Sequence, residues 1–292
     1  SSMIDTYLMD NLLKGIYYDT KIILVGDYHQ LPSVGPGNIL KDLILSKKFL
    51  TVELEVLYRV SGNSNILTFA DNIRNNIYDN TIFNKGKDLI FIPSDSNNIL
   101  DNFINICETY KDYNYNDFVI LAPMYKTKNG IDRLNIIARE IINPKTYQNE
   151  IIIGDIKYQE NDKVILLVNM PDFGVYNGDI GIIDTIDNLT KEIYIDFDGN
   201  IVKFTKKDFY NFRHGYVMSV HKSQGSEYKI VIVIMLNEYS RMLYKKLLYT
   251  GITRCREKLY VLGEESAIIK SINNDNENMR RTTLLDRINE LN

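Results

Sequence analysis

The sequence predicts an α/β protein whose mostly parallel sheet is interrupted by a small β-barrel. Apolar, strand-sized runs at residues 21–27, 117–123 and 229–235 are separated by amphipathic helical segments. Such alternation is typical of a parallel sheet that carries helices on both faces. Between residues 150 and 212 the pattern changes to short strands separated by Asn and Gly turns, so we expect an inserted barrel there.

Periodicity and boundary residues predict the individual elements. Ser64 is a suitable N-cap for the helix that follows it, and Asp198-Gly199 between two strand-like runs predicts a tight hairpin. Helices are expected over residues 3–16, 64–77, 97–111, 129–142 and 241–253, and strands over 21–27, 51–57, 89–92, 117–123, 229–235 and 258–263. The polar stretch 273–281 is expected to be loose.

Bulk composition narrows the class of protein. A chain of 292 residues with 45% hydrophobic and 25% charged residues is expected to form two globular domains. Its apolar runs are strand-sized and no secretion signal opens it, so we expect a cytoplasmic protein without a membrane segment. The two cysteines, Cys107 and Cys255, are too few for a disulfide framework. With a net charge of −4, any nucleic acid is expected to bind in a local groove.

One short loop concentrates groups that bind ligands. The stretch from Val220 to Glu227 lies between two strand-like segments and contains His221, Lys222 and several small residues. Small residues let the backbone approach a ligand closely, while Lys and His donate hydrogen bonds and Glu accepts them. Read alone, the loop is either a phosphate- or sugar-binding loop or an ordinary polar turn.

Other candidate residues have similar alternatives. Asp27 and Gln30 follow a strand-like run and could face a ligand or water, although Gly-Asp before Pro and Gly is also an ordinary turn. Arg59 could bind phosphate, whereas a lone arginine is commonly a surface or ion-pair residue. Arg254 could equally serve only as a cation at a helix C-terminus. Residue types alone leave these alternatives open.

Taken together, these segments resemble the carboxyl half of superfamily-one DNA helicases of the RecD-like type. The matching stretches occur in that family's order and comprise residues 26–35, 57–59, 121–126, 177–181, 221–227 and 248–254. The resemblance implies a second RecA-like domain of the P-loop NTPase type, with an SH3-like barrel inserted in it. The implied boundaries are residues 1–50 for the tail of a first RecA-like domain, 51–149 and 213–292 for the second, and 150–212 for the barrel.

The resemblance also implies roles for individual residues. Gln30 would sense the γ-phosphate of ATP, and Arg59 and Arg254 would be arginine fingers that reach the same phosphate. The other nucleotide-binding residues would be Gly26, Asp27, Gly225 and Glu227, with Glu227 at the sugar. Single-stranded DNA would lie near Pro123, Met124, Tyr125, Ser219, His221, Lys222 and Ser223.

ATP and Mg²⁺ are the implied cofactors, and single-stranded DNA, translocated in the 5′–3′ direction for recombination or repair, is the implied partner. The sequence identifies no subunit of a RecBC-like complex. It contains no Gly-x-x-x-x-Gly-Lys-Ser/Thr stretch, and the acidic pair for Mg²⁺ would precede Ser1. We therefore assign no metal ligand and expect an amino-terminal helicase half to be missing. The chain alone should hydrolyse no ATP, and residues 1–50 should form a partial layer with an exposed or swapped sheet edge.

Three positions depart from the family pattern, and the motifs are also compatible with other functions. Val60 stands where glutamine is common, which puts one polar contact near the nucleotide in doubt, while Gly251 and Cys255 replace alanines. The helicase region of a conjugative relaxase shares these motifs. A non-catalytic nucleic-acid-binding or scaffold subunit with a helicase fold is a further alternative, although it would have no use for three γ-phosphate sensors. A nuclease lacks support because no tight metal-site spacing is present.

Overall fold

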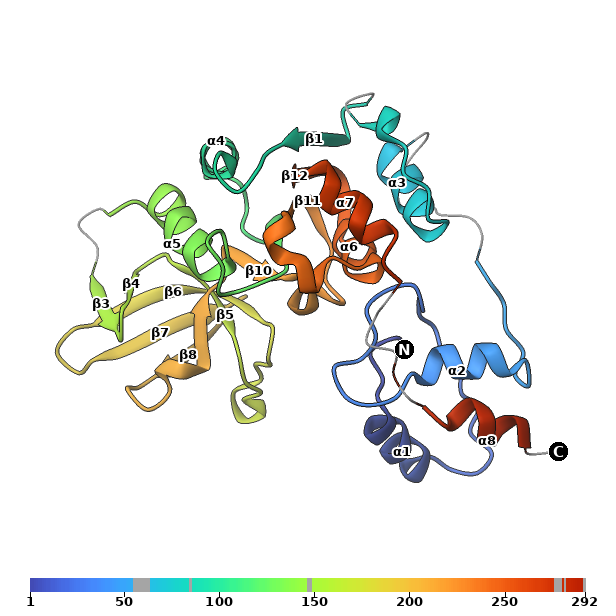
Figure 1. The fold of residues 1–292 in the computed structure, drawn as a ribbon. Coiled ribbons are helices and arrows are strands. Elements are labelled where there is room, and N and C mark those ends of the chain that lie inside the picture. The colour runs from blue at the N-terminus through green and yellow to red at the C-terminus, as the bar shows by residue number, and fades with distance from the viewer. Residues whose placement is uncertain (55–63, 84–85, 146–148, 276–279, 281, 291–292) are drawn as a thin grey trace.

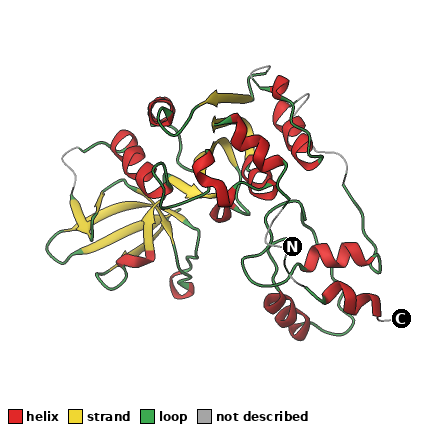
Figure 2. Cartoon of the chain, viewed as in Figure 1, coloured by secondary structure: helices red, strands yellow, loops and turns green. Residues whose placement is uncertain are grey.

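The computed structural model describes residues 1–292 except 55–63, 84–85, 146–148, 276–279, 281 and 291–292. The described residues form a parallel-sheet domain, a β-barrel and a helical region built largely from residues 1–50, which we call the N-terminal segment (Figure 1). Figure 2 shows the strands gathered in the sheet and the barrel, whereas the N-terminal segment consists of helices and loops.

The central sheet is parallel throughout, with strand order β1-β12-β11-β2-β10. Its strands are β1 (Leu89–Pro93), β2 (Phe118–Ala122), β10 (Val217–Ser219), β11 (Tyr228–Met235) and β12 (Cys255–Gly263). The central strands β2 and β11 are buried along nearly their whole length because helices cover both faces of the sheet. The predicted α/β fold class is therefore confirmed.

Two layers of helices enclose this sheet. One layer comprises α4 and α5, and the other comprises α3, α6 and α7 (Figure 1). The bounds are α3 (Asn65–Arg74), α4 (Ile99–Tyr110), α5 (Ile131–Ile142), α6 (Lys245–Ile252) and α7 (Glu265–Ile272). The Ser64 hydroxyl accepts a hydrogen bond from the Leu67 amide at 3.4 Å, so the predicted N-cap of α3 is confirmed. Helix α6 begins four residues later than predicted, after a 3₁₀ segment over Asn237–Met242.

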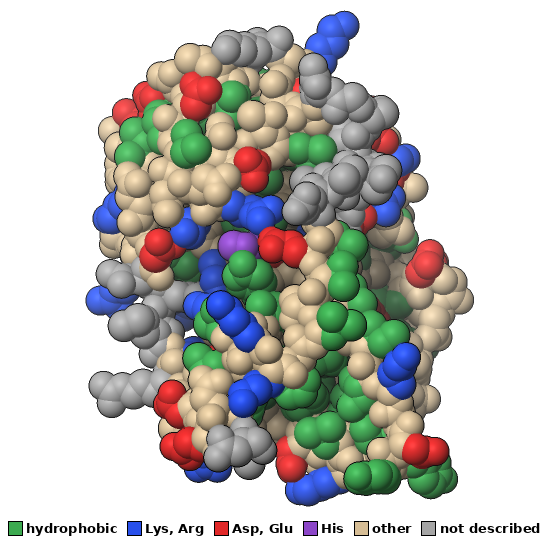
Figure 3. Space-filling view, turned by 90° about the vertical axis from the view of Figure 1, so that its right-hand side faces the viewer, with side chains coloured by type: hydrophobic (Ala, Val, Ile, Leu, Met, Phe, Trp, Pro, Cys, Tyr) green, Lys and Arg blue, Asp and Glu red, His purple; other side chains and the backbone are tan. Residues whose placement is uncertain are grey.

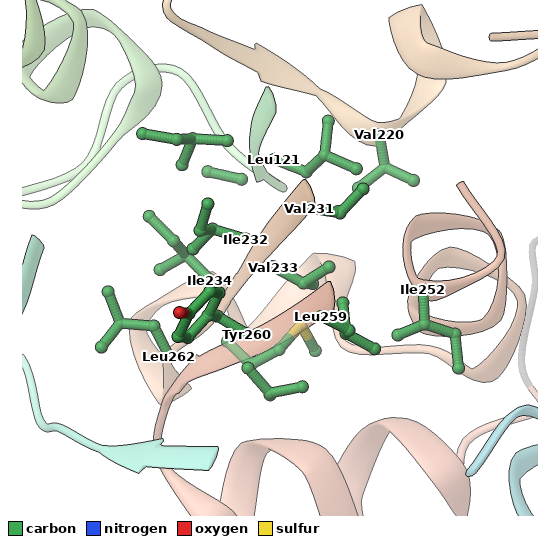
Figure 4. Packing of buried hydrophobic residues seen from close by; sticks show 14 of the residues in the cluster. Leu121, Val220, Val231, Ile232, Val233, Ile234, Ile252, Leu259, Tyr260 and Leu262 are labelled. Carbon is green, nitrogen blue, oxygen red and sulfur yellow. The ribbon is translucent and has the colours of Figure 1, made fainter. Parts of the chain in front are cut away.

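Alternating side chains of β11 fill the core on both sides of the sheet. In Figure 4, Val231 and Val233 point toward Ile252 of α6, whereas Ile232 and Ile234 point to the opposite side. All five of these side chains are fully buried. Because successive side chains of a strand point to opposite faces, β11 packs against both helical layers.

The barrel has its own hydrophobic core and antiparallel strands. The five-stranded sheet has the order β8-β7-β6-β5-β9, with β3 and β4 as a separate hairpin. The strands are β3 (Glu150–Ile153), β4 (Ile156–Gln159), β5 (Lys163–Leu166), β6 (Ile180–Asp187), β7 (Glu192–Phe197), β8 (Asn200–Phe204) and β9 (Phe212–His214). Asp198 and Gly199 both have positive φ, 56° and 91°, as the predicted hairpin requires.

A buried polar network joins the barrel to the sheet domain. The carboxylate of Asp162, which has no exposed surface, accepts a hydrogen bond from the Tyr216 hydroxyl at 3.0 Å. The Lys163 ammonium donates to the carbonyls of Tyr115 at 2.8 Å and Phe118 at 3.3 Å. Burial lowers the pKa of Lys163 to about 7.

The N-terminal segment packs on the edge of this assembly. It contains α1 (Thr6–Gly15) and α2 (Ile39–Ser46), and α8 (Leu284–Glu290) lies against α2 although it comes from the other end of the sequence (Figure 1). None of the residues of α1 is buried, and its apolar side chains face outward. Exposed hydrophobic side chains are also visible in the lower half of the space-filling view in Figure 3.

The strand predicted at residues 21–27 does not form. These residues are irregular, and Ile23 and Val25 are 78% and 73% exposed. A strand is stabilised by ladder hydrogen bonds and by a covered face, and the described residues offer neither beside this run. Residues 51–54 of the strand predicted at 51–57 are also irregular, and 55–57 lie outside the described residues. Thus the expected partial layer keeps its apolar residues exposed but has no sheet edge.

None of the helices in the described part of the chain is long and apolar enough to cross a membrane.

Candidate functional site

The sheet places the predicted site residues in two groups at opposite edges. Strands β2 and β10 end side by side, which brings Pro123 next to the loop that begins at Val220. Strands β11 and β12 begin together at the opposite edge, immediately after Glu227 and Arg254 respectively. The loop from Val220 to Glu227 therefore runs from one edge of the sheet to the other.

At one edge, Arg254 contacts Gln30 of the N-terminal segment. Its Nη2 donates to Gln30 Oε1 at 2.9 Å, although the two residues are 224 positions apart in the sequence. Gln30 also donates through Nε2 to Asp27 Oδ2 at 3.3 Å. Two of the three predicted phosphate-sensing residues thus lie in direct contact, while the third, Arg59, lies outside the described residues.

Backbone acceptors hold the Arg254 side chain in place. Its Nε donates to Thr250 O at 3.1 Å, and its Nη1 donates to Ser226 O at 3.2 Å. The residue is only 4% exposed. It follows α6 directly, so its charge also faces the negative end of the helix dipole. Different nitrogens of the guanidinium therefore bind the helix carbonyl of Thr250 and the side chain of Gln30.

The loop around Gln30 is anchored to the sheet domain on both sides. Before it, Asp27 Oδ2 accepts from the Tyr249 hydroxyl at 2.9 Å, and burial together with the Asp27 charge raises the pKa of that tyrosine. After it, the Leu31 amide donates to Thr250 Oγ1 at 2.7 Å, and Leu31 O accepts from Gln224 Nε2 at 2.8 Å. The Leu31 side chain, 2% exposed, belongs to the main hydrophobic core.

The remaining predicted nucleotide residues lie nearby with specific constraints. Gly225 has φ +86°, a conformation that glycine adopts without strain. Glu227 accepts from Arg256 Nε at 2.9 Å, so its carboxylate is held at the start of β11. A side chain at Gly26 would come within 2.9 Å of Leu40 Cδ2, so close packing favours glycine there.

At the other edge, barrel residues join the predicted nucleic-acid group. The Arg213 guanidinium lies over the Tyr125 ring, 4.8 Å from its centroid. Lys222 Nζ donates to Asn177 Oδ1 at 2.9 Å. Burial and the nearby Arg213 charge lower the pKa of Lys222. The barrel thus adds a cation and an amide to a surface that already carries an aromatic ring.

The other residues of this group differ in exposure. Pro123, Ser219 and Ser223 are buried, and Ser223 Oγ donates to Val220 O at 2.8 Å. Met124 and His221 are half-buried, and burial lowers the pKa of His221. A neutral imidazole at pH 7 can accept or donate a hydrogen bond without adding charge. The buried serines are therefore better placed to shape the loop than to contact a ligand directly.

A cavity of about 230 Å³ lies between the N-terminal segment and the sheet domain. Its lining includes His29, the cations of Lys41, Arg74, Lys245 and Lys246, and the carboxylate of Asp275, which pairs with Lys245. Figure 3 shows Lys and Arg side chains gathered around a hollow on this face. Burial and the nearby Arg74 lower the pKa of His29, although Asp27 opposes the shift. The lining is therefore suited to an anion.

Sequence reasoning missed several residues that complete these contacts. Tyr249 and Thr250 lie within the matching stretch 248–254, and Asn177 lies within 177–181. The sequence therefore includes these residues in the family pattern but does not indicate their hydrogen-bond partners. Arg213 could have been found as an arginine at the end of the barrel, beside the predicted loop. Nothing in the local sequence marks Arg280, whose contacts are described below.

Family profiles match three parts of the chain in the order that the fold requires. The profile described as an AAA domain matches residues 1–87, that of the ATP-dependent RecD-like DNA helicase SH3 domain matches residues 134–197, and that of the UvrD-like helicase C-terminal domain matches residues 214–262. The second confirms the predicted type of barrel, and the third contains both the loop to Glu227 and Arg254.

Individual proteins are similar over nearly the whole chain. The ATP-dependent RecD2 DNA helicase of Deinococcus radiodurans is 28% identical over 98% of this chain and 38% of its own length. The RecBCD enzyme subunit RecD of Buchnera aphidicola is 24% identical over 93% of this chain and 54% of its own length. The chain thus spans about two fifths to one half of these relatives.

Solved structures agree on the fold. Bacteroides Pif1 bound to single-stranded DNA superposes with a TM-score of 0.53 and 16% identity, covering 92% of this chain and 70% of that one. The described RecA-like parallel sheet, the RecD-like barrel and the order of the matching profiles agree with one another. The chain is therefore similar to RecD-like superfamily-one helicases in its profiles, its relatives and its fold.

Proposed function

We propose that the chain is the nucleotide-sensing and strand-gripping part of an ATP-dependent DNA helicase that moves 5′ to 3′ on single-stranded DNA. The observation that carries this proposal is the contact between Arg254 and Gln30 across the junction of two units. The similarity of the chain to a relative named an ATP-dependent DNA helicase supports the same reading. The proposed domains are residues 1–50, the RecA-like parts 51–149 and 213–292, and the barrel 150–212.

In this proposal Gln30, Arg59 and Arg254 surround the γ-phosphate of ATP, while Gly26, Asp27, Gly225 and Glu227 line the rest of the nucleotide. Phosphoryl transfer accumulates negative charge on the transferred group, and guanidinium groups stabilise that charge. Because Gln30 and Arg254 belong to different units, they surround the phosphate only when the units are close together. Hydrolysis then depends on domain closure, which is how such a motor converts chemistry into movement.

Single-stranded DNA is proposed to bind at the opposite edge of the sheet. Tyr125 would stack on a base, while Lys222, His221 and the loop from Pro123 to Tyr125 would follow the backbone, with the buried Ser219 and Ser223 shaping the loop. Arg213 and Asn177 extend this surface onto the barrel. The loop from Val220 to Glu227 connects the two edges and would carry changes at the nucleotide to the strand.

The cations of Lys41, Arg74 and Lys246 that line the cavity offer a favourable field for the phosphates of ATP. Mg²⁺ is proposed to enter with ATP and to be held by the nucleotide and by helicase residues outside this chain. Among the described residues, no group of three or more His, Cys, Asp or Glu side chains is placed to hold a metal ion. A non-catalytic subunit is less well supported, because a binder has no need of the Gln30–Arg254 pair.

The experiment that tests this proposal uses a polypeptide containing residues 1–292 together with a phosphate loop. Strand displacement is measured on duplexes carrying a single-stranded tail at either the 5′ or the 3′ end, with and without ATP. ATP-dependent displacement only from the 5′ tail is expected. Displacement from the 3′ tail would contradict the direction, and DNA binding without ATP turnover would favour the non-catalytic alternative.

A further inference from the structure

The guanidinium of Arg280 is bound by a single short loop of the N-terminal segment, residues 33–37. Its Nη1 donates to Gly35 O, to Gly37 O at 2.8 Å and to Ser33 Oγ at 3.2 Å, and its Nη2 donates to Ser33 O. Arginine presents five donors in a rigid plane, so one side chain can serve several carbonyls of a curved loop. A lysine at this position would carry the charge but not this geometry.

Residues after Arg280 extend the same contact. Thr282 Oγ1 donates to Asp42 Oδ2 at 2.7 Å, and Asp42 on α2 is only 4% exposed. Helix α8 then lies against α2, beside which it runs in Figure 1. We call Arg280 together with residues 282–290 the strap. It follows the sheet domain in sequence but packs on the N-terminal segment.

The loop is also held from its other side. The Thr6 amide and Thr6 Oγ1 both donate to Pro36 O, at 2.9 Å and 3.0 Å. Gly37 has φ +98°, and a Cβ there would come within 2.2 Å of Thr6 Oγ1. Four of the five carbonyls of the loop therefore have donors, one from the start of α1 and three from Arg280. Ser33 is 4% exposed, so its carbonyl depends largely on a protein donor.

This loop is continuous with the phosphate-sensing residue. Gln30 lies three positions before Ser33, and Leu31 between them is fixed to Thr250 and Gln224 of the sheet domain. Pro32 restricts the intervening backbone because its ring fixes φ. The backbone that carries Gln30 is thus set by the sheet domain on one side and by the strap on the other.

We propose that the strap is a positioning device for Gln30, with Arg280 as the residue that fastens it to loop 33–37. The contribution to turnover rests on the proposed function, whereas the contribution to the order of the loop does not.

The first test measures hydrogen exchange in the 292-residue chain and in Arg280→Ala, Arg280→Lys and Arg287→Ala variants. Arg287 lies on α8, is exposed and serves as the matched control. We expect about tenfold faster exchange at residues 31–42 in Arg280→Ala, an intermediate effect in Arg280→Lys, and none in Arg287→Ala. Exchange in β5–β8 should stay unchanged.

Two results would overturn the proposal: unchanged exchange at residues 31–42 in Arg280→Ala, or an equal increase in Arg287→Ala. If Arg280→Ala exchanges faster throughout the chain, including the barrel, then the test uses Arg280→Lys instead. Unchanged exchange at residues 31–42 in that variant, or an increase no larger than in Arg287→Ala, would overturn the proposal. Neither outcome involves nucleotide, so the proposed function is not at stake in this test.

The second test uses a polypeptide that contains this chain and a phosphate loop. Arg280→Ala should lower kcat for DNA-stimulated ATP hydrolysis by about tenfold, while KM for ATP and single-strand affinity change less than about threefold. A purely structural role would lower binding and turnover together. If the wild-type protein hydrolyses ATP and the variant keeps its kcat, the strap does not position Gln30. If the wild type itself is inactive, the proposed function fails and the exchange result still stands.

Discussion

The Gln30–Arg254 contact makes a quantitative prediction for the stability of the chain. Arg254→Ala removes four donated hydrogen bonds from a side chain that is 4% exposed, to Gln30, Ser226, Thr250 and Thr253. We expect this substitution to lower the free energy of unfolding by about 2–4 kcal/mol. Gln30→Ala should cost about 1 kcal/mol, because Gln30 is half-buried and water can replace part of its contact.

The interaction between the two residues follows from the double variant. A hydrogen bond to a charged group contributes roughly 1.5–3 kcal/mol, and partial hydration of Gln30 reduces this, so the expected coupling energy is about 1 kcal/mol. The assay is urea denaturation followed by far-UV circular dichroism on wild type, both single variants and the double variant, with unchanged slopes as a requirement. Far-UV dichroism avoids any need for tryptophan, which the chain lacks.

A matched control pairs Gln30→Ala with Arg256→Ala. Arg256 follows Arg254 closely but contacts Glu227 and not Gln30. These two substitutions should add within about 0.5 kcal/mol. Additive effects of Gln30→Ala and Arg254→Ala would refute the contact, and with it the proposal that the two units form one phosphate site.

Three other substitutions or measurements test different parts of the account. Lys163 has a folded-state pKa of about 7 against 10.5 unfolded, so the unfolded chain binds the extra proton between these values and stability should rise with pH. The free energy of unfolding of the wild type should be about 2–3 kcal/mol larger at pH 9.5 than at pH 7.5, and Lys163→Met should lack this increase. Equal pH dependence of stability in both proteins would contradict the lowered pKa of Lys163. Gly37→Ala should lower the stability of the N-terminal segment by about 1–3 kcal/mol, because an alanine at φ +98° is strained and its Cβ would clash with Thr6. An unchanged unfolding curve would show that the loop accepts alanine without strain. The 292-residue chain should hydrolyse no ATP and bind single-stranded DNA weakly, and robust DNA-stimulated ATP turnover would contradict this expectation. Arg213→Ala should weaken DNA binding more than the control Lys206→Ala, which lies on another barrel surface. Equal effects of the two substitutions on DNA affinity would contradict a role for Arg213.

The sequence was informative where local pattern and tertiary structure agree. The apolar runs that became β2, β11 and β12 are buried on both faces, so their composition alone predicts strands. Ser64 and Asp198-Gly199 act through their own backbone, and both predictions are confirmed. The matching stretches also identified the residues that meet at the Gln30–Arg254 contact, although spacing could not show that they touch.

The pattern failed where an element depends on a distant partner. The run at residues 21–27 has a strand's composition, but a strand needs a ladder partner, and Ile23 and Val25 remain exposed. The stretch 273–281 was expected to be loose, and that expectation is wrong for Arg280 and for Asn274, whose Nδ2 donates to Leu243 O at 2.8 Å. Polar side chains carry no periodicity, so long-range hydrogen bonds of this kind leave no local signal.

The most direct test of the account's central claim is ATP turnover by an Arg254→Ala variant of a polypeptide that contains this chain and a phosphate loop. DNA-stimulated hydrolysis and single-strand affinity are measured on the same preparation. If Arg254 stabilises charge on the transferred phosphate, turnover should fall about 10³-fold or more while affinity stays within about threefold of wild type. Turnover close to wild type, or an equal loss of turnover and DNA binding, would contradict the claim.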